Sequence, residues 1–542
     1  MTDGFTPWPP DRARRYRSAG HWLGRPLGTL LRERAADSPG HTALVAGDRR
    51  VDYAELDAWA DRLAGGLTQL GLEPGDRLLV QLDNRVEFVP LCFAAFRAGV
   101  IPVLIPPGHR IAELDALAEL SEAAGYVSPG RTAGFDYREL AEDLRRRRPG
   151  VRHLITVDDG DGSAVSLADL ALSAPATPHE PATPHEPDPG GVALLLLSGG
   201  TTGRPKLIPR THDDYHYNAR ASAAVTGLTA ADVYLAALPV THNFPLACPG
   251  LLGTVAVGGT AVLAPTPSPE DCLALIAAEG VTVTATVPSM VPLWLDEAAT
   301  GRHRLDSLRL LQVGGAVLTP QHAARIRTGL GCALQQVFGM AEGLLNYTRL
   351  DDPEELVLTT QGRPLSPDDE VRVVDAAGLP VGPGEQGELL TRGPYTINGY
   401  YREPERNAAS FTPDGFFRSG DLVRRGPDGH LTVTGRIKDQ INRGGEKIAA
   451  AELEEHVAAH TGVRQVAVIG VPDEALGERV CVCVVPDGAP PTLRALKRFL
   501  RERGAGTLLT PDRLELLDTL PLTAIGKVDK KALAARYAAP AD

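Results

Sequence analysis

Long hydrophobic runs are missing from this chain of 542 residues. No apolar segment approaches the ~20 residues needed to span a bilayer. The start of the chain, with Trp8, Pro9 and Pro10 followed by several arginines, lacks the apolar core of a signal peptide. An apolar content of 43% and a mean hydropathy of −0.10 are ordinary for a globular protein. The sequence therefore predicts a soluble, cytoplasmic protein with no membrane partner.

Cysteine and positive charge are also scarce. The six cysteines form no Cys-x-x-Cys pair of the kind used for zinc or redox chemistry, so we expect reduced thiols. A net charge of −13 and a pI near 5.6 argue against nucleic-acid binding, because such proteins carry a basic face. The arginine run 145–148 is the exception. No aromatic residues interleave with it, which favours the solvated end of a helix that begins near Tyr137.

Strand-like apolar runs alternate with helical patterns in the first part of the chain. The expected strands are 77–82 and 103–105, and the expected helices are 53–70 and 86–98. This alternation predicts an α/β body with largely parallel sheets. The chain is also longer than one hydrophobic core usually supports, so two or more domains are expected.

Two segments are candidate boundaries. The tandem repeat ATPHEP-ATPHEP at 176–187 is proline-rich and typical of a surface linker, so its histidines, His179 and His185, are not convincing metal ligands. Near 435–440 a strand-rich segment gives way to a shorter α/β unit, with a helix expected at 451–459 and strands at 465–470 and 480–485. We predict a large domain of residues 1–437 and a small domain of residues 438–542.

The segment LSGGTTGRPK at 197–206 carries the clearest chemical signal. Its glycines let the backbone approach an anion, its hydroxyl groups and backbone N–H groups can donate, and Lys206 adds a positive charge. A usual P-loop ends in Gly-Lys-Ser/Thr at a helix start, which Arg204 and Pro205 rule out here. We predict a phosphate-binding loop. The expected contact residues are Ser198, Gly199, Thr201, Thr202, Gly203 and Lys206.

This loop resembles that of the adenylate-forming ligases, a superfamily of acyl-CoA synthetases, adenylation domains of nonribosomal peptide synthetases and beetle luciferases. Four further segments resemble the family's motifs in the family's order: QVFGMAEG at 336–343, RSGDL at 418–422, GR at 435–436 and PLTAIGKVDK at 521–530. The resemblance implies an α/β fold, with a large N-terminal domain of parallel-rich sheets and helices and a small, mobile C-terminal α+β lid. It also implies a hinge at Lys438 and ATP with Mg²⁺ as nucleotide and metal.

By the same resemblance each motif has a role. Glu342 is the expected magnesium partner, because a hard cation takes one or two carboxylates and fills its other positions with phosphate and water. Asp421 suits the two ribose hydroxyls, and Arg436 suits ribose or phosphate. Lys527 would bridge the substrate carboxylate and the α-phosphate and stabilise the transition state. The nucleotide is further expected to contact Gly315, Val337 and Gly339.

The segment HNFPLACPG at 242–250 resembles the stand-alone aryl-acid adenylating enzymes of siderophore pathways, as does the amino terminus, so the resemblance covers nearly the whole chain. His242 matches a histidine near the reacting carboxylate. Asn243 stands where amino-acid-activating relatives place an aspartate, so a substrate ammonium would be uncompensated. An amide suits an ortho-hydroxyl or carboxyl group instead.

Two positions are expected to sort substrates within this group. Dihydroxybenzoate enzymes tend to have serine where this chain has Cys248 and valine where it has Leu345. Cysteine hydrogen-bonds more weakly and leucine is one methylene larger, so both changes favour salicylate, with neutral core variation as the alternative. One methylene discriminates by only about 1–3 kcal/mol, which leaves room for mixed substrate use. Gly314 and Ala341 complete the expected ring pocket.

We therefore predict an aryl acid–AMP ligase that forms salicyl-AMP and passes the acyl group to the phosphopantetheine of a separate aryl carrier protein. The chain ends soon after Lys527 without a carrier-like Gly-Gly-x-Ser segment, so the carrier is expected in trans, and residues 444–447 are expected to line its site. The alternatives are a 2,3-dihydroxybenzoate ligase, a ligase for a related ring such as 3-hydroxypicolinate or an anthranilate, an aryl-CoA synthetase, and a binding module without activity.

Overall fold

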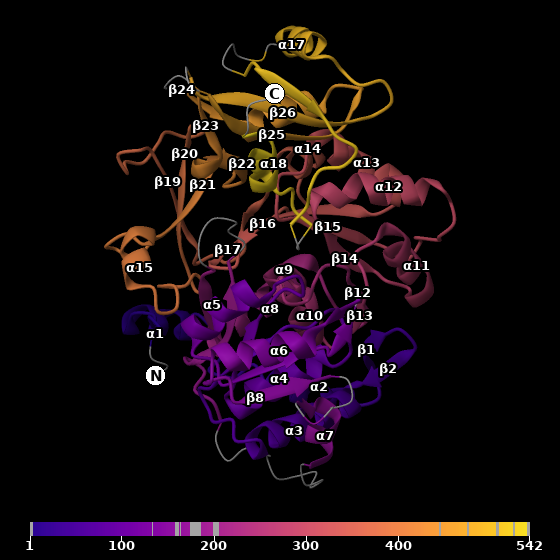
Figure 1. The fold of residues 1–542 in the computed structure, drawn as a ribbon, viewed down its shortest axis with the longest axis vertical. Helices are drawn as coiled ribbons and strands as arrows, with labels where there is room; N and C mark the ends of the chain where they lie inside the picture. Colours follow the sequence, from indigo (N-terminus) through magenta and orange to yellow (C-terminus); the bar gives the residue numbers. More distant parts are fainter. Residues whose placement is uncertain are drawn as a thin grey trace.

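The structure is a computed structural model that describes residues 4–132, 134–157, 162, 164–173, 186–198, 205–443, 446–473, 476–503, 505, 509–523 and 526–538. The N-terminal elements, in indigo and purple, occupy one end of the long axis, and the C-terminal elements, in yellow, occupy the other (Figure 1). None of the described helices combines the length and the apolar character needed to cross a membrane.

Two largely parallel sheets build the body, as the alternating pattern predicted. One has the order β11 (Leu207–Thr211), β10 (Val192–Leu197), β4 (Ile101–Leu104), β3 (Arg77–Val80), β5 (Gly125–Ser128), β8 (His153–Thr156), β9 (Val165–Ser166). The other has the order β18 (Arg363–Pro364), β17 (Gly343–Tyr347), β16 (Ala333–Met340), β15 (Leu310–Gly314), β14 (Val283–Thr286), β12 (Val233–Ala236), β13 (Thr260–Leu263), β1 (Thr42–Ala46), β2 (Arg49–Asp52). Antiparallel pairs occur toward the sheet edges, as between β10 and β11 and between β16 and β17.

Helices α3 (Tyr53–Gln69) and α4 (Phe88–Ala98) join the two sheets into one core. Every residue of α4 is buried, as expected for a mostly apolar helix, and its one charged residue, Arg97, pairs with Asp57 and Asp61. Its side chains share an apolar cluster with residues of both sheets, such as Leu78 and Tyr234. Helix α3 begins at the cap residue Asp52, whose carboxylate accepts from the Glu55 N–H at 2.7 Å.

The remaining helices of the body surround this core. They are α1 (Pro10–Ser18), α2 (Thr29–Asp37), α5 (Ile111–Ser121), α6 (Tyr137–Arg147), α7 (Leu167–Ser173), α8 (His212–Thr226), α9 (Asn243–Ala247), α10 (Gly250–Val257), α11 (Pro269–Glu279), the 3₁₀ turn η1 (Pro288–Met290), α12 (Val291–Ala299), α13 (Pro320–Leu330) and α14 (Glu354–Thr359). The expected helices 53–70 and 86–98 correspond to α3 and α4, and the expected strands 77–82 and 103–105 to β3 and β4.

The arginine run lies at the end of α6, as predicted, and three of its arginines form ion pairs. Arg146 and Arg147 contact Asp143, and Arg148 contacts Asp115 at 2.7 Å. All six cysteines are free and buried. The repeat with His179 and His185 lies outside the described residues.

Past the body, an antiparallel sheet has the order β19 (Glu370–Val374), β20 (Gln386–Arg392), β21 (Phe417–Arg425), β22 (Leu431–Arg436), with α15 (Pro404–Ser410) between β20 and β21. The turn η2 (Ile437–Asp439) leads into a last sheet of order β24 (Glu446–Ala449), β23 (Gln440–Arg443), β26 (Gly477–Pro486), β25 (Val463–Asp473), with β27 (Arg513–Leu516) beside β26. Its helices are α16 (Ala450–Ala458), α17 (Leu493–Glu502) and α18 (Lys530–Tyr537).

The C-terminal elements have a small apolar core of their own, which includes Leu453, Val482 and Leu496. The expected helix 451–459 corresponds to α16, and the expected strands 465–470 and 480–485 correspond to parts of β25 and β26. The division predicted after residue 437 falls at the turn η2 and stays a prediction.

Candidate active site

A cavity of about 530 Å³ lies where the body, the antiparallel sheet and the C-terminal elements meet. The described residues predicted for the acid, the nucleotide, the metal and the hinge all line it: Ser198, Lys206, His242, Asn243, Cys248, Gly314, Gly315, Val337, Gly339, Ala341, Glu342, Leu345, Asp421, Arg436, Lys438 and Lys527. Of the segment 444–447 predicted for the carrier site, 444 and 445 lie outside the described residues, and Glu446 does not line this cavity. The predicted loop residues Gly199, Thr201, Thr202 and Gly203 lie outside the described residues. Segments far apart in the sequence thus converge on one space, while the role of each residue stays a prediction.

Asp421 and Arg436 face each other on neighbouring strands. They are register partners of β21 and β22, and Arg436 Nε donates to Asp421 Oδ1 at 2.7 Å. Burial raises the pKa of Asp421, and the Arg436 guanidinium opposes that rise, which favours the carboxylate. One carboxylate oxygen is held by the arginine, and the other can accept hydrogen bonds from a diol such as ribose.

Glu342 lies at the turn between β16 and β17, opposite Tyr400. The Tyr400 hydroxyl donates to Glu342 Oε1 at 2.8 Å. Lys206 Nζ lies 3.5 Å from that hydroxyl and 4.6 Å from the ring centroid. Burial lowers the pKa of Lys206, while the Glu342 carboxylate raises it. The three side chains place a cation and an anion side by side at one wall of the cavity.

The described side chains at this wall would complete a Mg²⁺ site only together with substrate phosphates and water. Among the described residues, no group of three His, Cys, Asp or Glu side chains could hold a metal. Tyr400 occupies one oxygen of Glu342, and the bonds found among the described residues leave the other to a hard cation. Mg²⁺ is commonly bound through one or two carboxylates plus substrate phosphates and water, and this donor set agrees with that pattern.

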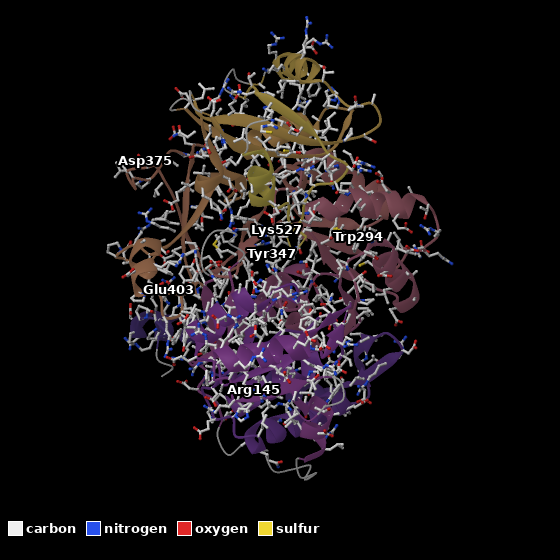
Figure 2. All side chains as sticks on the ribbon, viewed as in Figure 1. Arg145, Trp294, Tyr347, Asp375, Glu403 and Lys527 are labelled. Carbon is white, nitrogen blue, oxygen red and sulfur yellow. The ribbon has the colours of Figure 1, made fainter. Side chains whose placement is uncertain are left out.

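Lys527 reaches the cavity from the loop between β27 and α18, near the middle of the molecule (Figure 2). Thr523 holds the loop, since its N–H donates to Lys527 O at 2.7 Å and its Oγ1 accepts from Lys527 N at 3.2 Å. Gly315, at φ +89°, makes room, because a Cβ there would lie 3.0 Å from Lys527 Cε. Burial lowers the pKa of Lys527 to about 8, Arg436 acts in the same direction, and Asp421 opposes both. The side chain is therefore mostly cationic at neutral pH and suits an anionic ligand.

His242 caps α9 from the cavity wall. Its Nδ1 accepts from the Phe244 N–H at 3.3 Å. Burial and the nearby Lys527 ammonium together lower the pKa of His242 to about 3, so the imidazole is neutral at physiological pH. A neutral ring that accepts at Nδ1 carries its proton on Nε2, which can donate to a carboxylate.

Gly314 forms part of one wall of the cavity. A Cβ there would lie 2.5 Å from Val337 O and 3.3 Å from Phe244 Cε1, so no larger residue fits between these groups. Asn243 Nδ2 lies 3.4 Å from Cys248 Sγ in the lining of the same cavity. Burial raises the pKa of Cys248 to about 12, so the group stays a thiol. The wall suits a planar ring, with an amide beside it.

Sequence reasoning missed several residues of the site. Tyr400 contacts Glu342 across 58 positions of the chain, and no local pattern marks it. Arg210 is fully buried, pairs with Asp214 and donates to the carbonyl of the cavity residue Ala341 at 2.9 Å. Tyr215, one residue after that aspartate, bonds to Asn243. A charged pair near the start of a helix usually indicates a solvent-exposed contact, so only burial distinguishes this one.

Comparison with known proteins supports the same class. Residues 31–401 match the model of the AMP-binding enzyme family, and residues 452–527 match the AMP-binding enzyme C-terminal domain. The chain therefore belongs to the AMP-binding enzyme family of the adenylate-forming superfamily, and the family resemblance, the predicted fold class and the predicted enzyme class are confirmed.

Particular relatives cover nearly the whole chain. It is 54% identical to the salicyl-AMP ligase / salicyl-S-ArCP synthetase of Mycobacterium tuberculosis, over 98% of this chain and 94% of that protein. It is 50% identical to the 2,3-dihydroxybenzoate-AMP ligase of Bacillus subtilis, over 98% and 97%. The apo structure of MbtA from Mycobacterium smegmatis superposes with a TM-score of 0.76 at 51% identity, over 98% of this chain and 99% of the other.

Proposed function

We propose that this protein is an aryl acid–AMP ligase that activates salicylate with ATP. A carboxylate oxygen of the acid forms a bond to the α-phosphorus, the bond to the β-phosphate oxygen breaks, and pyrophosphate leaves with that electron pair. The observation that carries the proposal is one cavity that the Lys527 ammonium, the neutral His242 ring, the Asn243 amide and the backbone of Gly314 all line. Two named relatives of this chain act on ortho-hydroxybenzoates.

The chain's own groups provide the electrostatics of this reaction. Nε2 of His242 donates to the carboxylate and orients it, while Lys527 places a positive charge between the carboxylate and the α-phosphate. Asp421 and Arg436 hold the ribose end. Glu342 and Lys206 face the phosphates. Bound at Glu342, Mg²⁺ would offset charge on the phosphate oxygens.

Salicylate is preferred over 2,3-dihydroxybenzoate because of Cys248 and Leu345. The Cys248 thiol already has Asn243 Nδ2 at 3.4 Å and Asn243 O at 3.5 Å, and sulfur is a weak partner for a 3-hydroxyl. Leu345 lines the same cavity with a larger side chain than valine. Because the relative from Bacillus subtilis is named as a 2,3-dihydroxybenzoate-AMP ligase, 2,3-dihydroxybenzoate is the second candidate substrate.

The acyl acceptor in this proposal is the phosphopantetheine thiol of a separate aryl carrier protein, in siderophore or related nonribosomal peptide biosynthesis in the cytoplasm. The relative from Mycobacterium tuberculosis is named for such a transfer. A second cavity of about 1020 Å³ follows the contact between body and C-terminal elements and reaches His242 and Lys527, which offers a path for a thiol arm. Free CoA as acceptor is the alternative.

The test is ATP–pyrophosphate exchange with salicylate, 2,3-dihydroxybenzoate, benzoate, 3-hydroxypicolinate, anthranilate and amino acids, with Lys527→Ala as control. Strongest exchange with salicylate, lost in the control, supports the proposal. A preference for the dihydroxy acid keeps the aryl-acid activity but overturns the role given to Cys248 and Leu345. No exchange with any aryl acid rejects the proposed function. Acyl transfer is then measured with a carrier protein against free CoA.

A further inference from the structure

Tyr215 lies behind the ring pocket, on α8. Its side chain is fully buried, and its hydroxyl donates to Asn243 Oδ1 at 2.8 Å. The Arg210 guanidinium lies 4.7 Å from the tyrosine ring and is itself fully buried with Asp214. The ring is therefore held from behind by a buried ion pair, and its hydroxyl is presented to a single amide of the cavity wall.

The hydrogen bonds at this wall run in one direction. Tyr215 donates to Asn243 Oδ1, Asn243 Nδ2 approaches Cys248 Sγ at 3.4 Å, and Cys248 Sγ approaches Asn243 O at 3.5 Å. A phenol carries one donor hydrogen, and burial raises the pKa of Tyr215 well above its usual value, so that hydrogen is retained. Among the described residues, Asn243 Oδ1 is the acceptor found for it.

The opposite amide orientation is therefore disfavoured. With the oxygen and nitrogen of Asn243 exchanged, the phenol hydrogen would face an N–H group, and a buried donor without an acceptor is costly. In the observed orientation Nδ2 has two hydrogens, and the bonds of the described residues engage one of them, at Cys248. The other is available to a ligand in the cavity that Asn243 and Cys248 both line.

We propose that Tyr215 is a positioning residue that makes Asn243 a hydrogen-bond donor toward the ortho position of the substrate ring. The inference rests on the proposed function and adds a requirement for the substrate. The ortho substituent must accept a hydrogen bond. The phenolic oxygen of salicylate accepts while its own hydrogen turns to the carboxylate. Anthranilate presents an aromatic amine, whose lone pair is delocalised and whose N–H groups would face the amide N–H. Benzoate offers nothing at this position.

The experiment measures kcat/KM of ATP–pyrophosphate exchange for salicylate, benzoate and anthranilate with the full chain and Tyr215→Phe. The matched control is Tyr217→Phe, on the same helix, which removes another buried hydroxyl bond, to Ser366 Oγ at 2.7 Å. Since one hydrogen bond is at stake, the ratio of salicylate to benzoate is expected to fall about tenfold in Tyr215→Phe. The control leaves the ratio unchanged.

An unchanged ratio in Tyr215→Phe, or an equal loss with both acids, overturns the inference, because a structural defect would lower both alike. Failure of the proposed function is distinct, since the wild type would then exchange with no aryl acid. In an Asn243→Ala background, Tyr215→Phe is expected to leave the ratio unaltered, and a further fall would contradict the inference.

The wild type alone provides a second readout in case Tyr215→Phe does not fold. Exchange with anthranilate no faster than with benzoate, and at least about tenfold slower than with salicylate, supports the donor orientation of Asn243. Anthranilate used better than benzoate overturns it.

Discussion

Ser289 of the body donates a hydrogen bond to the carbonyl oxygen of Gly526 at 2.6 Å, one residue before the cavity lysine Lys527. Gln465 of β25 adds a bond to Ser289 O at 3.2 Å, so a single turn of the body contacts the C-terminal elements twice. These contacts hold the Lys527 loop at the cavity, and the position of the ammonium depends on them.

Ser289→Ala is expected to slow ATP–pyrophosphate exchange about tenfold, because a small displacement of a charged group in an active site is costly. Thermal unfolding is expected to change little, since the serine is only partly buried. Ser307→Ala serves as control, because Ser307 Oγ bonds to a backbone carbonyl away from the cavity, that of Ile276. Exchange at the wild-type rate would show that the loop is held without this bond.

The pH dependence of exchange is expected to report Lys527. The pKa of Lys527 is lowered to about 8, so the cation is present below that pH and is lost as the pH rises through it. His242, with a pKa of about 3, stays neutral and contributes no change between pH 5 and 8. The measurement is kcat/KM for salicylate from pH 5 to 10, which reports groups of the protein before the acid binds. A fall on the acid side near pH 6.5 would contradict the neutral imidazole.

Tyr400→Phe removes the hydroxyl that donates to Glu342 and contacts Lys206. The expected result is a KM for MgATP raised about tenfold, because the carboxylate and the ammonium lose a shared partner. Magnesium titrations of the exchange rate check this. Tyr53→Phe is the matched control, since its buried hydroxyl donates to Gly259 O at 2.7 Å, outside the cavity lining. An equal rise in both variants would exclude a specific role for Tyr400.

Arg210→Met is expected to destabilise the protein by about 3–5 kcal/mol, because Asp214 is left as an unpaired buried charge. Arg210→Met with Asp214→Asn is expected to recover part of that loss. Urea unfolding followed by circular dichroism measures both. A double variant no more stable than Arg210→Met would show that the bonds to Ala341 O and Tyr395 O, and not the ion pair, are the main contribution.

Contiguous motifs account for most of the site that could be predicted. The segments 336–343 and 418–422 each contain a predicted site residue together with several neighbours that match the family motif, and the described residues predicted from them line the cavity. Tyr400, Tyr215 and Ser289 stand in unremarkable segments. Their partners lie 58, 28 and 237 positions away, so no local spacing could show the contacts.

The sequence by itself determined the alternating α/β architecture and the chemical class of the site, because periodicity and short motifs are local properties. Tertiary structure alone decided which groups meet. It set the pairing of Asp421 with Arg436, the lowered pKa of Lys527 and the direction of the Asn243 amide. Burial and hydrogen-bond direction arise only when distant segments pack together, and they set the charge and the donor pattern that a ligand meets.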